Sequence, residues 1–507
     1  MDSALKSLGM DPERIRRHQA AIENAYRSSG APRFAIEDTC RLDNGGIQPL
    51  KGFSPAANAS NAPRDIVAFV PAAGAASRYS TPLFQLTSCL ESADCSLEEI
   101  VGHMESLKSE GAAFWPLPAS IASLLKAEDL RAALQSLDRH SLLEDLQLPK
   151  ALMPCVAEGM TFLEMKIREH EAIESLVGQL YVVPPRQSKA FLNAAAAVAH
   201  QIPIQVLEQG PDLSTIRFLP SGEPFREADG SLSPVPAGHG ALAALFPEVQ
   251  RIYPTARSIF IRNIDNVMGA KDPALRASRD FLNFHQMILN SIRTIRDSLS
   301  QSDWRSAGEA ARIILNQIQA SPHTAGDQST WPTCPERRSL CELQIRLFHS
   351  KPRGTNLDEE LKELYSRPVN TLGQVGNTGK DVGGTPCFVR VGDAVEKLCI
   401  EVPHASPEDK MKFLTDATKA THFNPVFVAA EITRSADYYA ARNQDFWLLS
   451  EKSYRGQKVV YYETVLFELL GNSRLANCAF VDVPRLVFNP HKALKDAIGV
   501  RLKRWLP

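Results

Sequence analysis

The stretch from Asp65 to Tyr79, DIVAFVPAAGAASRY, constrains the fold more than any other part of this chain. Ile66 to Val70 is a short run of β-branched and apolar residues, the pattern of a buried strand. The small residues that follow end at Ser77 and Arg78, so a strand leads into a tight loop with few side chains. Backbone N–H groups in such a loop can approach a phosphate chain closely. The stretch predicts a phosphate loop at residues 73–78, and a plain strand-to-helix turn with a surface arginine is the alternative.

Length and charge limit the class of protein. At 507 residues the chain is long for a single core, which predicts two or three structural units. The 56 Lys and Arg residues nearly balance the 58 Asp and Glu residues, so no overall field favours nucleic acid or an anionic membrane. No window reaches the roughly 18 apolar residues of a membrane helix, and the stretch MDSALKSLGMDPERIRRHQ has no apolar core of signal-peptide length. These features predict a cytoplasmic protein with local anion sites.

The cysteines do not suggest metal or redox chemistry. All 9 are scattered, and none forms a CxxC pair. We expect them to be reduced thiols, mostly structural.

Strand and helix patterns alternate along the first half of the chain. GQLYVVPP, KAFLNAAAAVAHQ, PIQVLEQ and STIRFLP follow one another between residues 178 and 220. This alternation predicts an α/β fold with a mixed, mainly parallel central sheet and helices on its faces. The expected parts are an N-terminal helical segment (1–62), a first core part (63–300) with a helical insertion at about 81–148, a helical connection (301–368), and a second core part with the C-terminal segment (369–507).

Three later positions carry candidate chemistry. Lys150, in LPKALMP, would be a useful point charge beside a phosphate loop, although a lysine taken alone is more often an ordinary surface residue. His239 stands between two glycines in a long Gly- and Pro-rich loop, which favours a ligand role over a surface-loop histidine. Asp265 follows the strand pattern Ser258–Ile261, and an extended segment would point Asn263 and Asp265 to one side, where Asp265 could hold Mg²⁺. An Asx turn that ends the strand is the alternative.

The order of several motifs resembles a known group of enzymes. FVPAAGAASR followed by LPKALMP resembles the glycine-rich loop and Pro-Lys of the sugar-phosphate nucleotidyltransferases. PAGHG, IFIRNIDNVMGA, ATHFNP, YYETVLFELL and VPRLVFNPHKALKDAI resemble, more narrowly, the UDP-sugar pyrophosphorylases of the UTP:glucose-1-phosphate uridylyltransferase type. The whole chain, with RHQAAIE and NGGI, is similar to a bacterial family known only as a domain of unknown function.

The resemblance implies a nucleotide-diphospho-sugar transferase fold (glycosyltransferase A-like, Rossmann-like) and a set of residue roles. Implied nucleotide-binding residues are Ala73, Gly74, Ala75, Ala76, Ser77, Gly238, His239, Gly240 and Asn263. Implied catalytic cations are Arg78, Lys150 and Lys492, with Asn266 and Asn424 near the substrate and Asp265 at Mg²⁺. The resemblance identifies no second metal carboxylate, and Glu401 and Asp393 are candidates only by their proximity to predicted strands.

This chain departs from the pattern in three places. Ala76 replaces the second loop glycine, and Pro425-Val426-Phe427 replaces the Thr-Asn-Asn that follows Phe-Asn. About 70 residues separate the phosphate loop from Lys150, which we interpret as an insertion. These departures bear on the identity of the substrate and on whether activity is retained.

The reaction implied by the resemblance joins a nucleoside triphosphate, with UTP favoured, to a sugar 1-phosphate and releases pyrophosphate. Two alternatives stay open. A glycosyltransferase with the same type of sheet would consume a nucleotide sugar, and a binding protein would hold one without turnover.

Overall fold

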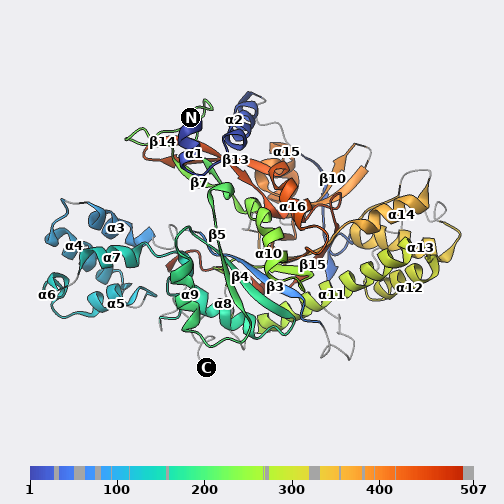
Figure 1. The fold of residues 1–507 in the computed structure, drawn as a ribbon, viewed down its shortest axis with the longest axis horizontal. Helices are drawn as coiled ribbons and strands as arrows, with labels where there is room; N and C mark the ends of the chain where they lie inside the picture. The colour runs from blue at the N-terminus through green and yellow to red at the C-terminus, as the bar shows by residue number, and fades with distance from the viewer. Residues whose placement is uncertain are drawn as a thin grey trace. The chain divides into compact units, whose positions relative to one another are not determined.

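The computed structural model describes residues 1–27, 34–50, 63–74, 81–92, 94–112, 115–136, 138–155, 159–266, 268, 273–318, 332–352, 356–379, 383–392, 394–416 and 418–494. The strand expected before the phosphate loop is present as β3(Ile66–Pro71), with its first five residues buried. It belongs to an eight-stranded sheet of order β2-β15-β9-β12-β8-β3-β4-β5 (Figure 1). The other strands are β2(Gln48–Pro49), β15(Asn477–Val483), β9(Val369–Gly376), β12(His422–Glu431), β8(Ser258–Ile261), β4(Leu176–Val183) and β5(Ile204–Glu208).

This sheet has the predicted mixed, mostly parallel character. β4 pairs with β5, and β15 with both β9 and β2, in parallel. β12 is antiparallel to β9 and to β8. The strand-helix-strand order predicted from the alternating patterns is confirmed by β4, α9(Ser188–Ala196) and β5.

The chain divides into two compact units that are discontinuous in sequence. Unit 1 contains Met1–Val67, Gly210–Ile261 and Ala277–Arg485. Unit 2 contains Ala68–Gln209, Arg262–Arg276 and Leu486–Pro507. Each unit therefore draws on segments that lie far apart along the chain.

Unit 1 holds most of the later strands and helices. From the large sheet it contains β2, β8, β9, β12 and β15. Its other elements are β6(Ser214–Ile216), β7(Pro234–Pro236), α10(Phe246–Ile252), α11(Pro273–Ser300) from its second turn, α12(Trp304–Leu315), α13(Pro335–Leu343), α14(Leu357–Ser366), β10(Thr385–Val391), β11(Ala394–Ile400), α15(Pro407–Asp409), α16(Ala436–Arg442), β13(Trp447–Tyr454), β14(Gln457–Thr464) and α17(Leu466–Leu470). α12, α13 and α14 gather into one helical group (Figure 1). The helical character predicted for residues 301–368 is thus present over these described helices.

The N-terminal segment is less purely helical than the sequence predicts. α1(Asp2–Ser7) and α2(Pro12–Arg27) are present, and Asp11 accepts hydrogen bonds from Glu13 N at 2.9 Å and Arg14 N at 3.3 Å. However, β1(Ala35–Thr39) pairs antiparallel with β10, and β2 pairs with β15. Such short strands form only against partners hundreds of residues away, so local sequence patterns do not reveal them.

Unit 2 contains the helical insertion expected at about 81–148. Its helices are α3(Phe84–Glu91), α4(Leu97–Ser109), α5(Ala119–Lys126), α6(Leu130–Gln135) and α7(Arg139–Leu146). A capping box begins α4: Ser96 Oγ accepts from Glu99 N, and Ser96 N donates to Glu99 Oε2 at 2.7 Å. Apolar residues from these helices share one core with α8(Phe162–Glu171) and α9.

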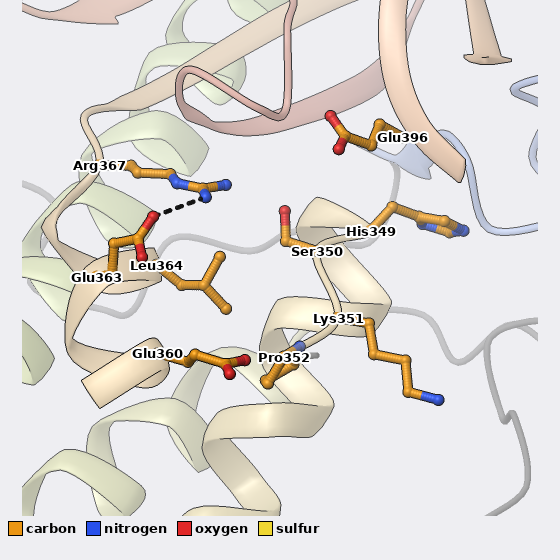
Figure 2. A pocket seen from close by; sticks show the side chains of 9 residues that line it. All are labelled: His349, Ser350, Lys351, Pro352, Glu360, Glu363, Leu364, Arg367 and Glu396. Carbon is orange, nitrogen blue, oxygen red and sulfur yellow. Dashed lines mark hydrogen bonds and ion pairs between the residues drawn. The ribbon is translucent and has the colours of Figure 1, made fainter. Parts of the chain in front are cut away.

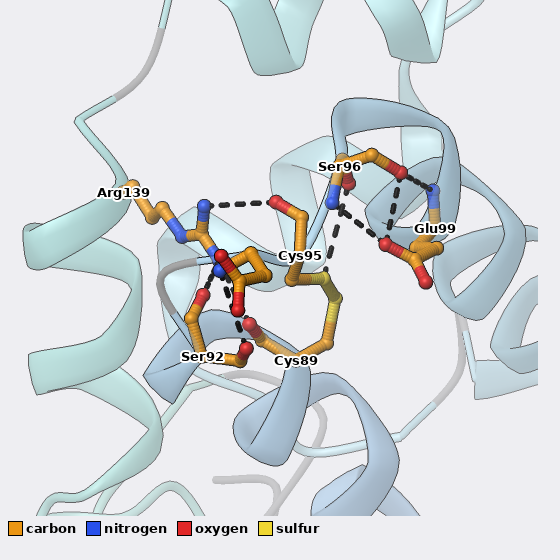
Figure 3. The surroundings of a disulfide bond; sticks show 7 residues. Cys89, Ser92, Cys95, Ser96, Glu99 and Arg139 are labelled. Carbon is orange, nitrogen blue, oxygen red and sulfur yellow. Dashed lines mark hydrogen bonds between the residues drawn. A yellow bond between two sulfur atoms is a disulfide. The ribbon is translucent and has the colours of Figure 1, made fainter.

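Two insertion cysteines correct the expectation that all cysteines are reduced. Cys89, in α3, and Cys95, before α4, form a disulfide, while the other seven cysteines are free thiols (Figure 3). The Arg139 guanidinium donates to the carbonyls of Cys89 and Ser92 at 2.8 and 2.7 Å, and to that of Cys95 at 3.1 Å. The positions of the cysteines in the sequence did not predict this disulfide, because it forms only where α3 and α4 pack together.

Among the helices that the structure describes, none is long and apolar enough to cross a membrane.

Candidate functional site

Lys150 and Asp265 form an ion pair in unit 2. Lys150 Nζ lies 3.0 Å from Asp265 Oδ2, although 115 residues separate the two in sequence. The lysine side chain is 11% exposed and the aspartate side chain 24%, so the pair is shielded but open on one side. Two residues predicted to face phosphate and metal therefore meet.

The start of the phosphate loop lies beside this pair. Lys150 N donates to the Gly74 carbonyl at 3.4 Å. Among the residues that the structure describes, none has an atom within 4 Å of a Cβ added at Gly74. Ala73 is half-buried and Gly74 exposed, whereas Ala75, Ala76, Ser77 and Arg78 lie outside the described residues.

Residues 263–266 form a turn, which we name the Asp265 turn. Asn266 N donates to the Asn263 carbonyl at 3.2 Å. The segment is therefore not extended, and the prediction that Asn263 and Asp265 point to one side by strand alternation is wrong. A backbone turn follows the strand, closed by a carbonyl rather than by the side chain of the Asx turn that we weighed as the alternative, and it still brings Asp265 to Lys150.

Asn263 and Asn266 have different surroundings in this turn. Asn263 is exposed. Asn266 is 5% exposed, and its Oδ1 accepts from Asn489 N at 2.7 Å. The structure thus shows Asn266 anchoring the turn, and its substrate role stays a prediction.

The segment 489–492 packs against the Asp265 turn. His491 N donates to the Asp265 carbonyl at 2.9 Å, and Pro490 forms an antiparallel bridge with Asn266. The next residue, Lys492, is exposed. Three stretches predicted to act together, around residues 150, 265 and 492, are thus neighbours in one unit.

Phe162 joins these stretches and was missed by sequence reasoning. Lys150 Nζ lies 5.4 Å from the centroid of its ring, and the His491 ring meets it edge-on at 6.1 Å. Phe162 begins α8, where Thr161 Oγ1 accepts from Glu164 N at 3.1 Å. Nothing in the local sequence distinguishes it from an ordinary core phenylalanine.

The Gly-His-Gly motif belongs to unit 1 and packs on the turn between β14 and α17. A Cβ at Gly238 would lie 2.6 Å from the Thr464 carbonyl oxygen, and one at Gly240 would lie 2.6 Å from the Thr464 carbonyl carbon. His239 Nδ1 accepts from Leu466 N at 3.0 Å, and burial lowers the pKa of His239 to about 4. The histidine is therefore neutral near pH 7 and holds backbone, and its ligand role stays a prediction.

Asn424 also belongs to unit 1, at an irregularity in β12. Its φ is +46° and its N–H donates to the Gly384 carbonyl at 2.7 Å. An added Cβ at Gly384 would meet Glu401 Oε1 at 3.3 Å and Pro425 Cδ at 3.4 Å. One of the two carboxylates proposed from sequence, Glu401, thus lies near the Phe-Asn-Pro segment, while Asp393 falls outside the described residues.

A pocket in unit 1 contains none of the predicted site residues. It is lined by His349, Ser350, Lys351, Pro352, Glu360, Glu363, Leu364, Arg367 and Glu396 (Figure 2). Glu363 and Arg367 form an ion pair of 3.4 Å on one side, and Glu396 of β11 lies across from them. It adds no residue to the site predicted from sequence.

The acidic groups near Lys150 suit one kind of metal binding. Among the described residues, no three His, Cys, Asp or Glu side chains gather at one point. Mg²⁺ needs no such cage, because it is commonly held by one or two carboxylates together with substrate phosphates. Asp265, a half-buried carboxylate beside a lysine and a small-residue loop, fits that arrangement.

Comparisons with solved structures place the fold. The chain is similar to a UDP-glucose phosphorylase from Trypanosoma brucei, with 12% identity, a TM-score of 0.51, and coverage of 98% of this chain and 76% of that one. It is also similar to a variant UDP-glucose pyrophosphorylase from Leishmania major in complex with UDP-glucose, with 13% identity, a TM-score of 0.48, and coverage of 98% and 77%. At 12% identity the likeness to the Trypanosoma brucei structure shows the fold alone, and it supports the predicted α/β fold with a mixed, mainly parallel central sheet.

The family comparison agrees with the resemblance to a domain of unknown function that we inferred from the sequence. The sequence profile of a family described as "Domain of unknown function (DUF4301)" matches residues 3–501. No curated protein matches the chain.

Proposed function

Because the chain belongs to the DUF4301 family, whose description assigns no activity, we propose its function from the site: it is a sugar-1-phosphate nucleotidyltransferase that releases pyrophosphate. The observation that carries the proposal is the Lys150–Asp265 pair beside Gly74. A shielded cation, a carboxylate and an exposed glycine backbone are groups that phosphoryl chemistry uses. The similar folds, described as UDP-sugar enzymes, favour UTP as the nucleotide.

In the proposed reaction an oxygen of the sugar phosphate attacks the α-phosphorus of the nucleoside triphosphate, and the bond to pyrophosphate breaks. The attacking phosphate is already ionised at neutral pH, so no general base is required. The task of the protein is alignment and charge neutralisation. Lys150 would face the reacting phosphates, with Lys492 and Arg78 as further cations.

Asp265 would hold Mg²⁺, which supplies additional neutralisation of phosphate charge when bound. Without substrate, Lys150 and Asp265 neutralise one another at 3.0 Å. A triphosphate offers a new partner to the lysine, and its metal offers one to the carboxylate. Each charge of the pair thus has a partner of opposite sign in a partly buried site.

The test is pyrophosphate release, measured with Mg²⁺ across a grid of nucleoside triphosphates and sugar 1-phosphates. We expect one pair to give a signal that Lys150→Ala lowers by about 10²–10³-fold, the usual effect of losing one group that stabilises a transition state. Lys189→Ala is the matched control, since it removes an exposed lysine from α9 of the same unit. Equal losses of activity in the two variants would show that Lys150 has no specific role in the reaction.

A silent grid would overturn the proposal. If a nucleotide sugar nevertheless raised the melting temperature, a glycosyltransferase or a binding protein would replace it. Turnover with an acceptor sugar would then separate those two.

A further inference from the structure

A buried charged cluster lies directly behind the Asp265 turn in unit 2. It consists of Lys166 and Glu169 on α8 and Arg262 just after β8, with side chains that are all 0% exposed. Lys166 Nζ lies 3.0 Å from Glu169 Oε2, and Arg262 pairs with Glu169 Oε1. Sequence reasoning missed all three, because charged residues in a helix usually face solvent.

Both cations donate to a single backbone carbonyl. Lys166 Nζ lies 2.7 Å from the Asn266 oxygen, and an Arg262 amino group lies 2.9 Å from the same atom. One neutral donor would be enough to satisfy a buried carbonyl. Two charged donors on one carbonyl fix its direction and hold it more strongly, since hydrogen bonds from ionised groups are stronger than neutral ones.

Burying this cluster is costly. Burial lowers the pKa of Lys166 to about 8, with the Arg262 charge lowering it further and Glu169 opposing both. Burial also lowers the pKa of Arg262. A core built for stability alone would use apolar side chains here, because a buried ion pair often contributes no more than its apolar replacement.

The Asp265 turn is held from a second direction as well. His491 N and Asn489 N donate to the Asp265 carbonyl and to Asn266 Oδ1, at 2.9 and 2.7 Å. The backbone on both sides of the Asp265–Asn266 peptide is thus fixed, while the Asp265 side chain stays free to exchange Lys150 for another partner.

We propose that Lys166, Glu169 and Arg262 are positioning residues that hold the Asp265 carboxylate against Lys150. The inference rests on the proposed function, in which Asp265 and Lys150 act on phosphate and metal. The three residues touch no substrate. They set the direction of the Asn266 carbonyl and, through the adjoining peptide, the place of Asp265.

The test variant is Lys166→Met, which leaves the balanced pair of Arg262 and Glu169 in the core. The matched control is Lys397→Met, which removes another buried lysine, in unit 1, whose Nζ donates to the Leu347 carbonyl at 2.6 Å. The measurement is the rate at which acetic anhydride acetylates Lys150 in the folded protein, followed by mass spectrometry. Labelling needs no substrate and reports the Lys150–Asp265 pair directly.

We expect Lys166→Met to raise the Lys150 labelling rate by about tenfold, the order set by one hydrogen bond from a charged donor. Lys397→Met should leave the rate unchanged. An unchanged rate in Lys166→Met, or an equal rise in both variants, would overturn the proposal. If Lys166→Met does not fold, Arg262→Met is used, since it leaves Lys166 and Glu169 as a balanced pair.

Enzymatic measurements separate this inference from the proposed function. In an active enzyme, Lys166→Met should raise the Mg²⁺ concentration needed for half-maximal rate more than it raises KM for the sugar phosphate, and equal rises would count against positioning of Asp265. If the wild type releases no pyrophosphate while Lys150 labelling responds as expected, the positioning role stands and the proposed reaction is lost.

Discussion

At the scale of single residues, Glu401 shows how a buried carboxyl couples stability to pH. Burial and the neighbouring Glu468 carboxylate raise its pKa to about 7, with His404 opposing them. Glu401 N donates to Glu468 Oε1 at 2.9 Å, and Glu468 lies 2.7 Å from His404 Nδ1. The folded protein therefore favours protonated Glu401.

We predict that Glu401→Gln flattens part of the stability profile between pH 5 and pH 8. In the folded state Glu401 keeps its proton up to about pH 7, whereas the unfolded chain releases it near 4.5. Its contribution is full below pH 4.5 and is lost as the pH rises to about 7, an effect of about 3 kcal/mol. Denaturant unfolding at pH 5 and at pH 8 measures this change in the free energy of unfolding. Parallel stability profiles for the variant and the wild type would contradict the prediction.

At the scale of elements, the strands and helices with strong local patterns were predictable and those that depend on distant partners were not. β3, β4, α9, β5 and β8 all lie where apolar runs or helical spacing place them. β1 and β2 were missed because each takes its stability from a strand of the second half of the chain. Periodicity within a segment predicts its secondary structure, but it does not identify the distant strand with which the segment pairs.

The candidate site likewise contains some residues that the sequence predicts and others that it does not. Lys150 and Asp265 were predicted from motif order, and the structure joins them at 3.0 Å. Phe162 was not predicted because a phenylalanine in a helix usually packs in the core. Lys166 and Arg262 were not predicted because charged residues usually lie at the surface. The turn at Asp265 was misjudged because a hydrogen bond from Asn266 to Asn263 ends the extended backbone.

The loop that carries His239 offers a paired test of close packing between elements. Gly238 has φ +81° and ψ 173°, a backbone region essentially restricted to glycine, and Gly230 has φ +80°, so alanine is strained at both by about 1–3 kcal/mol. Only at Gly238 would the added methyl collide with Thr464, at 2.6 Å, whereas Gly230 has open space. We predict that Gly238→Ala costs about 1–3 kcal/mol more than Gly230→Ala. Urea unfolding of both variants measures the difference, and equal losses would refute the close contact.

At the scale of the whole molecule, each unit is assembled from distant segments, and the N-terminal helices show what this means for unit 1. Leu5, Met10, Ile15 and Ile22 are buried in a cluster with Phe218, Val460 and Tyr462. His18 stacks on Tyr462 at 4.0 Å and lies 2.9 Å from Thr215 Oγ1. The helices thus form part of a core rather than an appendage.

We predict that Ile15→Ala destabilises the packing of the N-terminal helices in unit 1. It should lower the free energy of unfolding by about 2–5 kcal/mol, as truncations of buried aliphatic side chains do. Hydrogen exchange in β14 should rise, because Val460 and Tyr462 lose their cover, while exchange in β4 of unit 2 should stay the same. Arg17→Ala, on the exposed side of α2, is the control. Equal exchange in β14 of both variants would show that the helices are dispensable.

The hydrogen bonds from residues 489–491 to the Asp265 turn also have a consequence for biosynthesis. A ribosome releases Lys150 and Asp265 hundreds of residues before it releases Asn489 and His491, which hold the turn. Until then, the Asp265 carbonyl and the Asn266 amide oxygen lack these two donors. A chain that stops before Asn489 therefore carries an unfinished site, and the site is completed only after this late segment has emerged and packed on the turn.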